Sequence, residues 1–394
     1  MFHRHLSKEL KQLLSKGKSI LLLGPRQVGK TTLAMTLDCD LKWNLAVNKD
    51  RQAFERNPDL LAQRIQEYQK KKPFIFIDEI QKVPSLLNEI QHLIDEKKAQ
   101  FLLTGSSARK LKHEVEVNLI PGRILNLRMD PLCSTEASQP WLSLIQYGQL
   151  PQILTESEKK MKTLLLKSYI ENYIEDEIRK ETKIRNIANY SRFLELAAIQ
   201  SGKVTNFSEI SKELGPTITT IQSYYQVLED TLFADRIDPY LKNSQRKKLT
   251  KSSKYLFFDL GVRRFCAHES VASTPDRQGE LFEHLIGNEL LKWIRLRLLP
   301  AKLYFWRDSD GPEVDWLIEY EGHLLPIEVK CKEKLEKKDA RHLYTFLSEY
   351  ASAQKSFLVG TNSFSFDIDE KVRAVAWTEL FQNLDRWVAD TEKI

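Results

Sequence analysis

The stretch Ser19–Thr32, SILLLGPRQVGKTT, decides the fold of the N-terminal part of this 394-residue chain. Its apolar first part predicts a buried β-strand, and Gly24–Thr32 matches GxxxxGK[ST], a loop between a strand and a helix. Helical spacing continues through Leu33, Ala34 and Leu37. In such a loop the glycines let backbone N–H groups turn toward a phosphate, and the helix start adds its positive dipole end. We therefore predict nucleotide contacts along the loop, from Gly24, Pro25, Arg26, Gln27, Val28, Gly29, Lys30, Thr31 and Thr32.

Two side chains of the loop carry the chemistry. Lys30 is predicted to reach the β- and γ-phosphate oxygens of ATP, and the Thr31 hydroxyl is predicted to ligate Mg²⁺. The alternative is a glycine-containing turn that only resembles the motif. The buried strand before the loop and the helix after it argue against that alternative.

A second strand is predicted over Phe74–Glu79, where the apolar run FIFI ends in two acids. Such a run suits a central parallel strand that is covered on both faces. Asp78 is the candidate for holding Mg²⁺, and Glu79 is the candidate base that polarises the attacking water. An ordinary strand that leads into an acidic turn is the alternative.

A third strand, Phe101–Gly105, ends in hydroxyl side chains. Thr104 and Ser106 are candidates for sensing the γ-phosphate or positioning water, although a Thr-Gly-Ser turn is also ordinary. Arg123 follows Pro121 and Gly122, and it is a candidate for placing positive charge on the γ-phosphate. The sequence leaves open whether Arg123 acts in its own chain, acts across a homo-oligomer, or is a solvated arginine.

Composition describes a globular protein with 42% hydrophobic and 29% charged residues and a net charge of +6. The charge permits a nucleic-acid partner without demanding one. Cys39, Cys133, Cys266 and Cys331 are isolated, with no CxxC pair, which favours reduced thiols. No apolar stretch is long enough to span a bilayer, and no signal-peptide core follows Met1–His5. These features predict a cytoplasmic protein without a membrane partner.

The predicted fold class is α/β with several domains. Residues 1–130 alternate strands and helices as a doubly wound nucleotide-binding core does. Residues 131–188 are predicted to be a helical lid or linker, with one long amphipathic helix over Met161–Thr182. A winged helix-turn-helix is predicted for 189–268, and a small mixed-sheet domain for 269–394.

The winged-helix prediction rests on helices near Ser191–Gln200, after a cap at Ser208, and over Ile218–Leu232. A strand-like segment and a basic segment follow. The basic residues are Lys242, Arg246, Lys247, Lys248, Lys251 and Lys254. The third helix has no Lys or Arg, so packing or non-specific contact with a DNA backbone is favoured over base reading. The basic segment has a plain alternative, a solvated hairpin.

A second cluster of chemistry-bearing residues lies near the C-terminus. Glu283 is predicted to share one stripe of a helix with apolar residues, where an acid needs a partner. Strands over 313–318 and 324–330 follow, and their period of two places Glu328 and Lys330 on one face. Asp315 from the neighbouring strand would make an oxygen-rich site for Mg²⁺ or Mn²⁺, with Lys330 as a catalytic group and Glu283 completing the shell. A harmless charged ladder on a sheet edge is the alternative.

Together, GPRQVGKTT, FIFIDEI, FLLTGSS, the PGR turn and EVDWLI…PIEVK resemble one family of prokaryotic AAA-type ATPases. Members carry a winged-helix segment and a restriction-endonuclease-like C-terminal domain of unassigned role. The resemblance implies an AAA-type core in which Lys30, Thr31, Asp78 and Glu79 have the usual ATPase roles, with Arg123 in the matching Gly-Arg turn. It also implies that Glu283, Asp315, Glu328 and Lys330 occupy the positions of a PD-(D/E)xK nuclease site. Thr104 stands where many AAA proteins have Asn.

The sequence thus predicts an Mg²⁺-dependent ATPase whose nucleotide cycle controls a nuclease-like domain directed at DNA, without sequence specificity or by DNA structure. A second Mg²⁺ or Mn²⁺ would lie in the C-terminal domain. The alternative is a nucleotide-driven switch or scaffold, in which the winged helix and an inactive nuclease-like domain bind proteins. A sequence-specific transcription regulator is a third, weaker hypothesis.

Overall fold

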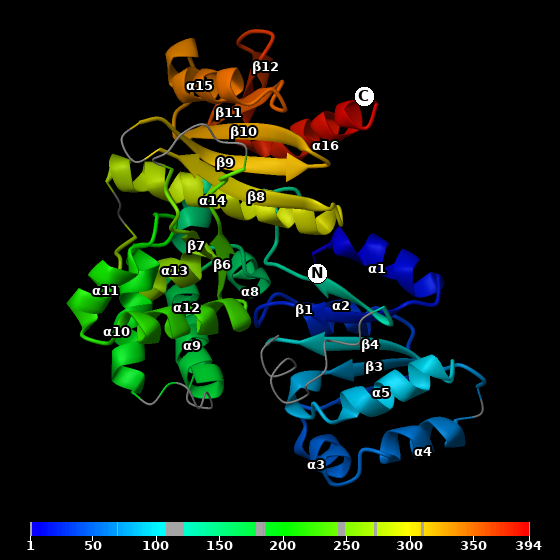
Figure 1. Cartoon of the computed structure of the whole chain (residues 1–394). Helices are drawn as coiled ribbons and strands as arrows, with labels where there is room; N and C mark the ends of the chain where they lie inside the picture. The colour runs from blue at the N-terminus through cyan, green and yellow to red at the C-terminus, as the bar shows by residue number, and fades with distance from the viewer. Residues whose placement is uncertain are drawn as a thin grey trace. The chain divides into compact units, whose positions relative to one another are not determined.

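The computed structural model describes residues 2–68, 70–107, 122–178, 184, 186–242, 249–271, 274–308 and 311–393. The chain divides into two compact units. The first comprises Met1–Leu132, Leu150–Gln152 and Val227–Phe233, and the second comprises Cys133–Gln149, Ile153–Gln226 and Ala234–Ile394. Each unit combines helices with a β-sheet, so the predicted α/β fold class is confirmed (Figure 1).

The elements of the N-terminal unit follow one another in the alternating order that the sequence predicts. They are α1 (Leu6–Ser15), β1 (Ser19–Leu23), α2 (Lys30–Met35), β2 (Leu41–Asn44), α3 (Asn48–Arg56), α4 (Leu60–Glu67), β3 (Phe74–Asp78), the 3₁₀ turn η1 (Ile80–Lys82), α5 (Leu86–Asp95), β4 (Gln100–Gly105) and β5 (Ile124–Arg128). The three strands predicted near 19–23, 74–79 and 101–105 are confirmed as β1, β3 and β4.

The five strands form a parallel sheet in the order β2-β3-β4-β1-β5. β1 is buried along its whole length, as a parallel strand covered on both faces requires. On one face, strand residues such as Leu21, Ile77 and Leu103 form a core with residues of α3, α4 and α5. Because all strands run the same way, the loop after β1 and the ends of β3 and β4 meet at one edge of the sheet.

The second unit begins with helices. They are α7 (Trp141–Tyr147), α8 (Pro151–Thr155), α9 (Lys159–Tyr173), the π-helix η2 (Ile174–Ile178), α10 (Ile187–Ile199), α11 (Phe207–Leu214), α12 (Ile218–Asp230) and α13 (Leu260–Cys266). Two sequence predictions need correction. The single α-helix predicted over 161–182 ends at Tyr173 and continues as a π-helix, and 179–183 lie outside the described residues. The cap of α11 is Asn206, not Ser208, because the Asn206 side chain accepts the Ser208 and Glu209 N–H groups.

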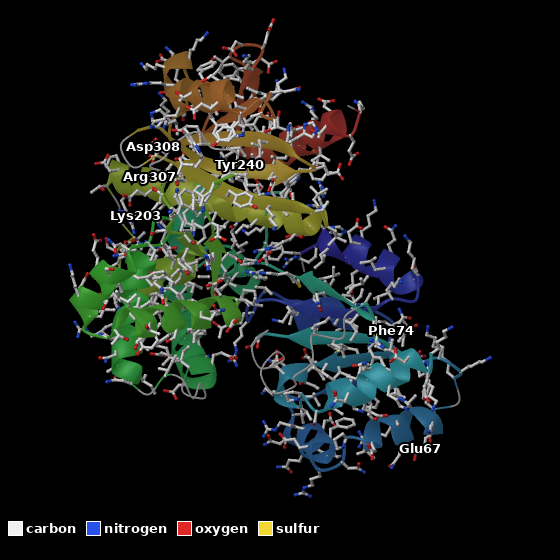
Figure 2. All side chains as sticks on the ribbon, in the orientation of Figure 1. Glu67, Phe74, Lys203, Tyr240, Arg307 and Asp308 are labelled. Atoms are coloured by element: carbon white, nitrogen blue, oxygen red, sulfur yellow. The ribbon has the colours of Figure 1, made fainter. Side chains whose placement is uncertain are left out.

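After the three helices α10, α11 and α12 comes an antiparallel pair, β6 (Ala234–Ile237) and β7 (Lys254–Phe257). Both ends of the connecting segment are anchored along strand β8 (Ala301–Arg307): Tyr240 N donates to the Phe305 carbonyl, and Thr250 N donates to the Arg307 carbonyl. Figure 2 labels Tyr240, Arg307 and Asp308 in this region. Lys242 is paired with Glu319 at 2.7 Å. Arg246, Lys247 and Lys248 of the predicted basic segment lie outside the described residues.

The C-terminal part of the second unit is a mixed sheet of order β12-β13-β11-β10-β9-β8. Its further elements are α14 (Pro275–Leu296), β9 (Glu313–Tyr320), β10 (His323–Lys330), η3 (Lys337–Ala340), α15 (Arg341–Glu349), β11 (Ser356–Gly360), β12 (Phe366–Asp367), β13 (Val372–Ala376), η4 (Trp377–Glu379) and α16 (Leu380–Thr391). Residues of α14 and α16 pack on one face with Trp316 and Ile327, and α15 packs on the other with Leu317 and Leu324 (Figure 1). The alternation of β10 therefore places Glu328 and Lys330 on the face of Leu324.

Candidate functional site

The loop after β1 has the backbone that a phosphate cradle requires. Gly24 lies so close to the Met129 backbone that a Cβ at this position would be 2.2 Å from the Met129 carbonyl oxygen. Gly29 has φ +100° and caps α2, and Gln27 also has positive φ, at +61°. Only glycine satisfies both the close approach at Gly24 and the conformation of Gly29 without strain. The two glycines of the motif therefore allow the tight loop that the sequence predicts.

Lys30 lies over this loop. Its Nζ donates to the Gly24 and Pro25 carbonyls at 2.8 Å each, and the side chain is buried. Arg4, which the sequence analysis did not single out, donates to the Val28 carbonyl at 2.8 Å and the Asp130 carbonyl at 2.7 Å. Arg4 therefore ties the chain before α1 to the loop. A lone arginine upstream of the motif carries no sequence signal for this role.

Asp78 and Thr31 meet at the edge of the sheet. Thr31 Oγ1 donates to the Asp78 carboxylate at 2.9 Å, and the buried Thr104 hydroxyl also donates to it. Neighbouring ligands of an octahedral Mg²⁺ at 2.0–2.1 Å lie about 2.9 Å apart. The Thr31 hydroxyl and the Asp78 carboxylate are thus spaced and chemically suited to share that ion.

Glu79 follows Asp78 in the left-handed backbone region, with φ +59°. Its N–H donates to Thr104 Oγ1 at 3.2 Å, so Thr104 links both acids at the end of β3. The Glu79 carboxylate accepts a hydrogen bond from Gln81 Nε2 at 2.5 Å. Gln81 was not among the predicted residues. Its position two residues after the acid pair was the only available signal.

The structure does not bring Arg123 to this edge within one chain. Arg123 precedes β5, whose first residue Ile124 pairs with Ser19 at the opposite end of β1 from the loop. Its Nε lies 2.5 Å from the Asp95 carboxylate, and both side chains are largely exposed. The prediction that Arg123 acts on a γ-phosphate of its own chain is therefore wrong, because parallel pairing fixes it at the far edge. Action across subunits stays a prediction.

Of the four residues predicted for the second site, Asp315, Glu328 and Lys330 lie together on neighbouring strands. Asp315 Oδ2 accepts the Val329 N–H at 2.8 Å, which joins β9 to β10 beside Glu328. Lys330 Nζ lies 2.7 Å from Glu328 Oε1. Glu283, on α14, lies near enough for its charge to raise the pKa of both Asp315 and Glu328. Gly287, one turn later, allows α14 to pack closely on the sheet: a Cβ there would be 2.6 Å from the Trp316 ring.

A fifth residue, Lys254 of β7, belongs to this cluster. Its Nζ lies 3.0 Å from Glu283 Oε1, 4.9 Å from the centre of the Trp316 ring and 5.0 Å from that of Phe305. Lys254 is the last residue of the predicted basic segment. Its position at the start of the apolar strand YLFF was a signal that the lysine is buried. We call Lys254, Glu283, Asp315, Glu328 and Lys330 the carboxylate–lysine cluster.

Burial dominates the electrostatics of the cluster. It raises the pKa of Asp315 well above its ordinary value, and the charges of Glu283 and Glu328 raise it further. Burial also raises the pKa of Glu328, to about 7, against the opposing effect of Lys330. For Lys254, burial lowers the pKa, but Glu283 and Asp315 outweigh it and the net shift is upward. The same balance holds for Lys330, where burial lowers the pKa and Glu328 and Asp315 outweigh it, so both lysines are charged partners of the acids.

The cluster meets only part of what a metal site needs. Across the described residues, no group of three or more His, Cys, Asp or Glu side chains is arranged to hold a metal ion. Lys254 pairs with Glu283, the third acid of the predicted set. Glu328 Oε2, however, is buried and has no hydrogen-bond partner among the described residues. Asp315 and Glu328 thus offer two carboxylates, one with an oxygen that no described residue pairs.

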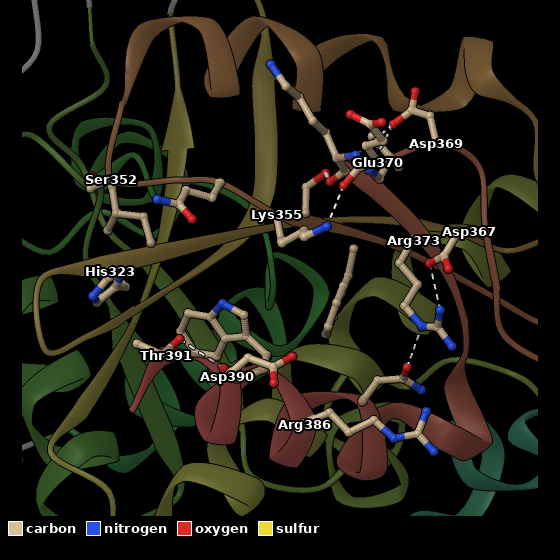
Figure 3. A pocket seen from close by; sticks show the side chains of 18 residues that line it. His323, Ser352, Lys355, Asp367, Asp369, Glu370, Arg373, Arg386, Asp390 and Thr391 are labelled. Carbon is tan, nitrogen blue, oxygen red and sulfur yellow. Dashed lines mark hydrogen bonds and ion pairs between the residues drawn. The ribbon is translucent and has the colours of Figure 1, made fainter. Parts of the chain in front are cut away.

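The second unit also contains a cavity of about 580 Å³ at the other end of β10. Its wall includes His323, Lys355, Arg373 and Trp387. Figure 3 labels the first three of these residues. The cationic groups are compensated in part: Arg373 donates to Asp367 and Asn383, and Lys355 donates to the Glu370 carbonyl. Of the predicted site residues, all of which are described, none lines this cavity.

With this geometry in place, the chain can be compared with known proteins. Residues 16–138 match an AAA domain, AAA_14. The N-terminal unit is therefore an AAA-type P-loop core, which supports nucleotide binding and hydrolysis. Residues 139–271 and 278–380 match two domains of unknown function, DUF8612 and DUF4143. No helix among the described residues is both long and apolar enough to cross a membrane.

Two curated relatives have names without a function. They are the uncharacterized proteins Mb2031c of Mycobacterium bovis and Rv2008c of Mycobacterium tuberculosis, each 25% identical over 339 residues, which is 83% of this chain and 73% of theirs. Among solved structures, Cdc6p from Pyrobaculum aerophilum is 12% identical over 71% of this chain and 92% of that protein, with a TM-score of 0.29. That similarity is too low to support a functional comparison.

Proposed function

We propose that this protein is an Mg²⁺-dependent ATPase whose nucleotide cycle controls a DNA-directed C-terminal domain. The ATPase part is carried by one observation: the Thr31 hydroxyl and the Asp78 carboxylate lie 2.9 Å apart beside the loop that Lys30 covers. Two oxygen ligands of an octahedral cation and a lysine for phosphate oxygens are thus assembled at one sheet edge.

The residues divide the work between binding and positioning. Lys30 exchanges its bonds to the Gly24 and Pro25 carbonyls for phosphate oxygens, and the backbone N–H groups of the loop hold the phosphates. When bound, Mg²⁺ supplies the positive charge that stabilises the phosphoryl group during transfer. Thr104 keeps Asp78 in place, and Glu79 polarises the attacking water. Positioning and electrostatic stabilisation account for catalysis by such a site.

The test compares Lys30→Ala with Lys42→Ala, a matched change at an exposed lysine of the same unit. We expect release of phosphate from Mg-ATP by wild type and Lys42→Ala, and a loss of at least about 100-fold for Lys30→Ala. Calorimetry with Mg-ATP measures binding in parallel. Absence of hydrolysis by wild type, or full turnover by Lys30→Ala, would remove the proposed ATPase.

For the C-terminal domain, DNA is the proposed partner and cleavage is a second candidate function. The observation that favours cleavage is the buried Glu328 Oε2 beside Lys330, an oxygen that has no partner in the part of the chain that the structure describes. A single cation held by Asp315 and Glu328 would suit attack on a phosphodiester. Plasmid incubated with Mg²⁺ or Mn²⁺ and wild type should be nicked, and Glu328→Ala should not nick it. Equal nicking by both proteins would assign the activity to a contaminant.

The rival proposal is a nucleotide-driven scaffold, and the lysines of the cluster favour it. Lys254 and Lys330 already neutralise carboxylates that would be needed to bind a metal cation. Lys242 of the basic segment is paired with Glu319. Titration of labelled duplex and single-stranded DNA at 50 and 200 mM salt, with and without Mg-ATP, separates the two. Salt-sensitive binding supports the DNA-directed role. No binding at low salt in either nucleotide state supports the scaffold.

A further inference from the structure

Gln81 joins the ends of two strands at the nucleotide site. It belongs to η1, immediately after the acid pair, and its side chain is buried. Gln81 Nε2 donates to Glu79 Oε2 at 2.5 Å and to Ser106 Oγ at 3.0 Å. Both N–H bonds of the amide are thus used, one on the carboxylate after β3 and one on the hydroxyl after β4.

These two hydrogen bonds fix the orientation of the Gln81 side-chain amide, that is, which of its two terminal atoms is the oxygen. If the amide were turned over, its carbonyl oxygen would face the Glu79 carboxylate, and two acceptors would be in contact. Only the orientation with nitrogen toward Glu79 satisfies the carboxylate. The carbonyl oxygen, Gln81 Oε1, must therefore lie on the other side of the amide group.

Gln81 Oε1 has no hydrogen-bond partner within the described part of the chain, although it is buried. Buried polar atoms in native proteins are nearly always paired, so an unpaired acceptor beside a nucleotide loop indicates a donor that arrives with the ligand. The hydrolytic reaction brings one such donor, the attacking water. Its two hydrogens need two acceptors, and Glu79 supplies one.

The backbone of Glu79 adds a second reason for a positioned base. Glu79 has φ +59°, a conformation that is costly for a residue with a side chain. Its N–H is held by Thr104 and its carboxylate by Gln81. The direction of the carboxylate is therefore set from both ends.

We propose that Gln81 is a catalytic residue of ATP hydrolysis, which holds Glu79 through its N–H group and accepts a hydrogen of the attacking water through Oε1. The inference rests on the proposed ATPase. In the step it assists, the water oxygen bonds to the γ-phosphorus and the bond from that phosphorus to the β–γ bridging oxygen breaks. The electron pair stays on ADP, and the water proton passes to Glu79 and then to phosphate. ATP and water give ADP and inorganic phosphate.

The variants separate the effect of the hydrogen bonds of the Gln81 amide from the effect of its side-chain volume. Gln81→Met keeps the length of the side chain and removes both the donor and the acceptor, whereas Gln81→Glu keeps an acceptor, removes the donor and places a second carboxylate against that of Glu79. Gln63→Met, at an exposed position of α4 in the same unit, is the matched control. Each protein is assayed for thermal melting, for Mg-ATP binding by calorimetry and for phosphate release.

We expect Gln81→Met to bind Mg-ATP within about threefold of wild type, with kcat lowered about 10- to 100-fold, and Gln63→Met to match wild type. A kcat within twofold of wild type in Gln81→Met would overturn the inference. Loss of Mg-ATP binding or folding in both Gln81 variants would also overturn it, because the residue would then be a structural bridge. If wild type itself hydrolyses no ATP, the proposed function fails first, and that result is distinct.

Discussion

The two acid clusters of this protein are held in opposite ways. At the nucleotide site, Asp78 and Glu79 accept hydrogen bonds from neutral groups, the hydroxyls of Thr31 and Thr104 and the amide of Gln81. In the carboxylate–lysine cluster, Glu283 and Glu328 are bonded to Lys254 and Lys330. Neutral donors orient a carboxylate and leave its charge available to a cation, whereas a lysine orients it and compensates that charge. We therefore expect the first arrangement to attract Mg²⁺ more strongly than the second.

The largest effect, on ATP turnover, is expected when one acid is replaced in each cluster in turn. Asp78→Asn should lower ATP turnover about 100- to 1,000-fold, because it removes a charged ligand of the cation. Asp315→Asn should leave ATP turnover within twofold of wild type. Steady-state phosphate release with Mg-ATP measures both. A comparable loss in the two variants would show that the clusters are not chemically separate.

The next test removes the internal cation of the C-terminal cluster. Lys254→Met leaves the partly buried Glu283 without its partner and should lower the free energy of unfolding by about 1–3 kcal/mol. Adding Glu283→Gln should recover part of that loss, since the uncompensated charge is gone. Denaturant unfolding measures both, with Lys251→Met at an exposed site as the control. Unchanged stability in Lys254→Met would contradict the contribution of this pair.

The acids of the cluster also predict a pH dependence. Burial raises the pKa of Glu328 to about 7, whereas a glutamate in the unfolded chain titrates near about 4.3. Between these values the folded protein holds more protons than the unfolded one, so this group lowers stability as pH rises through the interval.

Glu328→Gln removes that titration. The free energy of unfolding of the variant minus that of wild type should therefore be about 2–3 kcal/mol larger at pH 8 than at pH 4.5. Glu333→Gln, at an exposed position, is the control. An equal stability difference at both pH values would mean that Glu328 is ionised in the folded protein throughout this range.

The smallest effect is expected at Arg123. Its pair with Asp95 is exposed to solvent, which screens the interaction, and Arg123 lies at the far edge of the sheet from the phosphate loop. Arg123→Ala should therefore leave stability and dilute-solution ATP turnover nearly unchanged. Turnover assayed over a range of protein concentrations completes the test. A large loss that appears only as concentration rises would assign Arg123 to a neighbouring subunit.

Much of the nucleotide site was predictable, because its groups are adjacent in sequence or end neighbouring strands. Asp78 and Thr104 could be paired with the loop from the rule that parallel strands end at one edge. For Arg123 only action within its own chain failed under the same rule, because the sequence did not reveal that the residue precedes its strand and so lies at the opposite edge. Gln81 was missed because a glutamine in a 3₁₀ turn has no pattern of its own.

Sequence alone determined the phosphate loop, the order of strands and helices in the N-terminal unit, and the period of two that aligns Glu328 with Lys330. Each of these depends on spacing within a few residues, which backbone geometry fixes. Only the tertiary structure decided that Lys254 neutralises Glu283 and that Gln81 Oε1 has no partner among the described residues. Those outcomes depend on which side chains from separate segments share one desolvated volume, and a linear pattern does not contain that information.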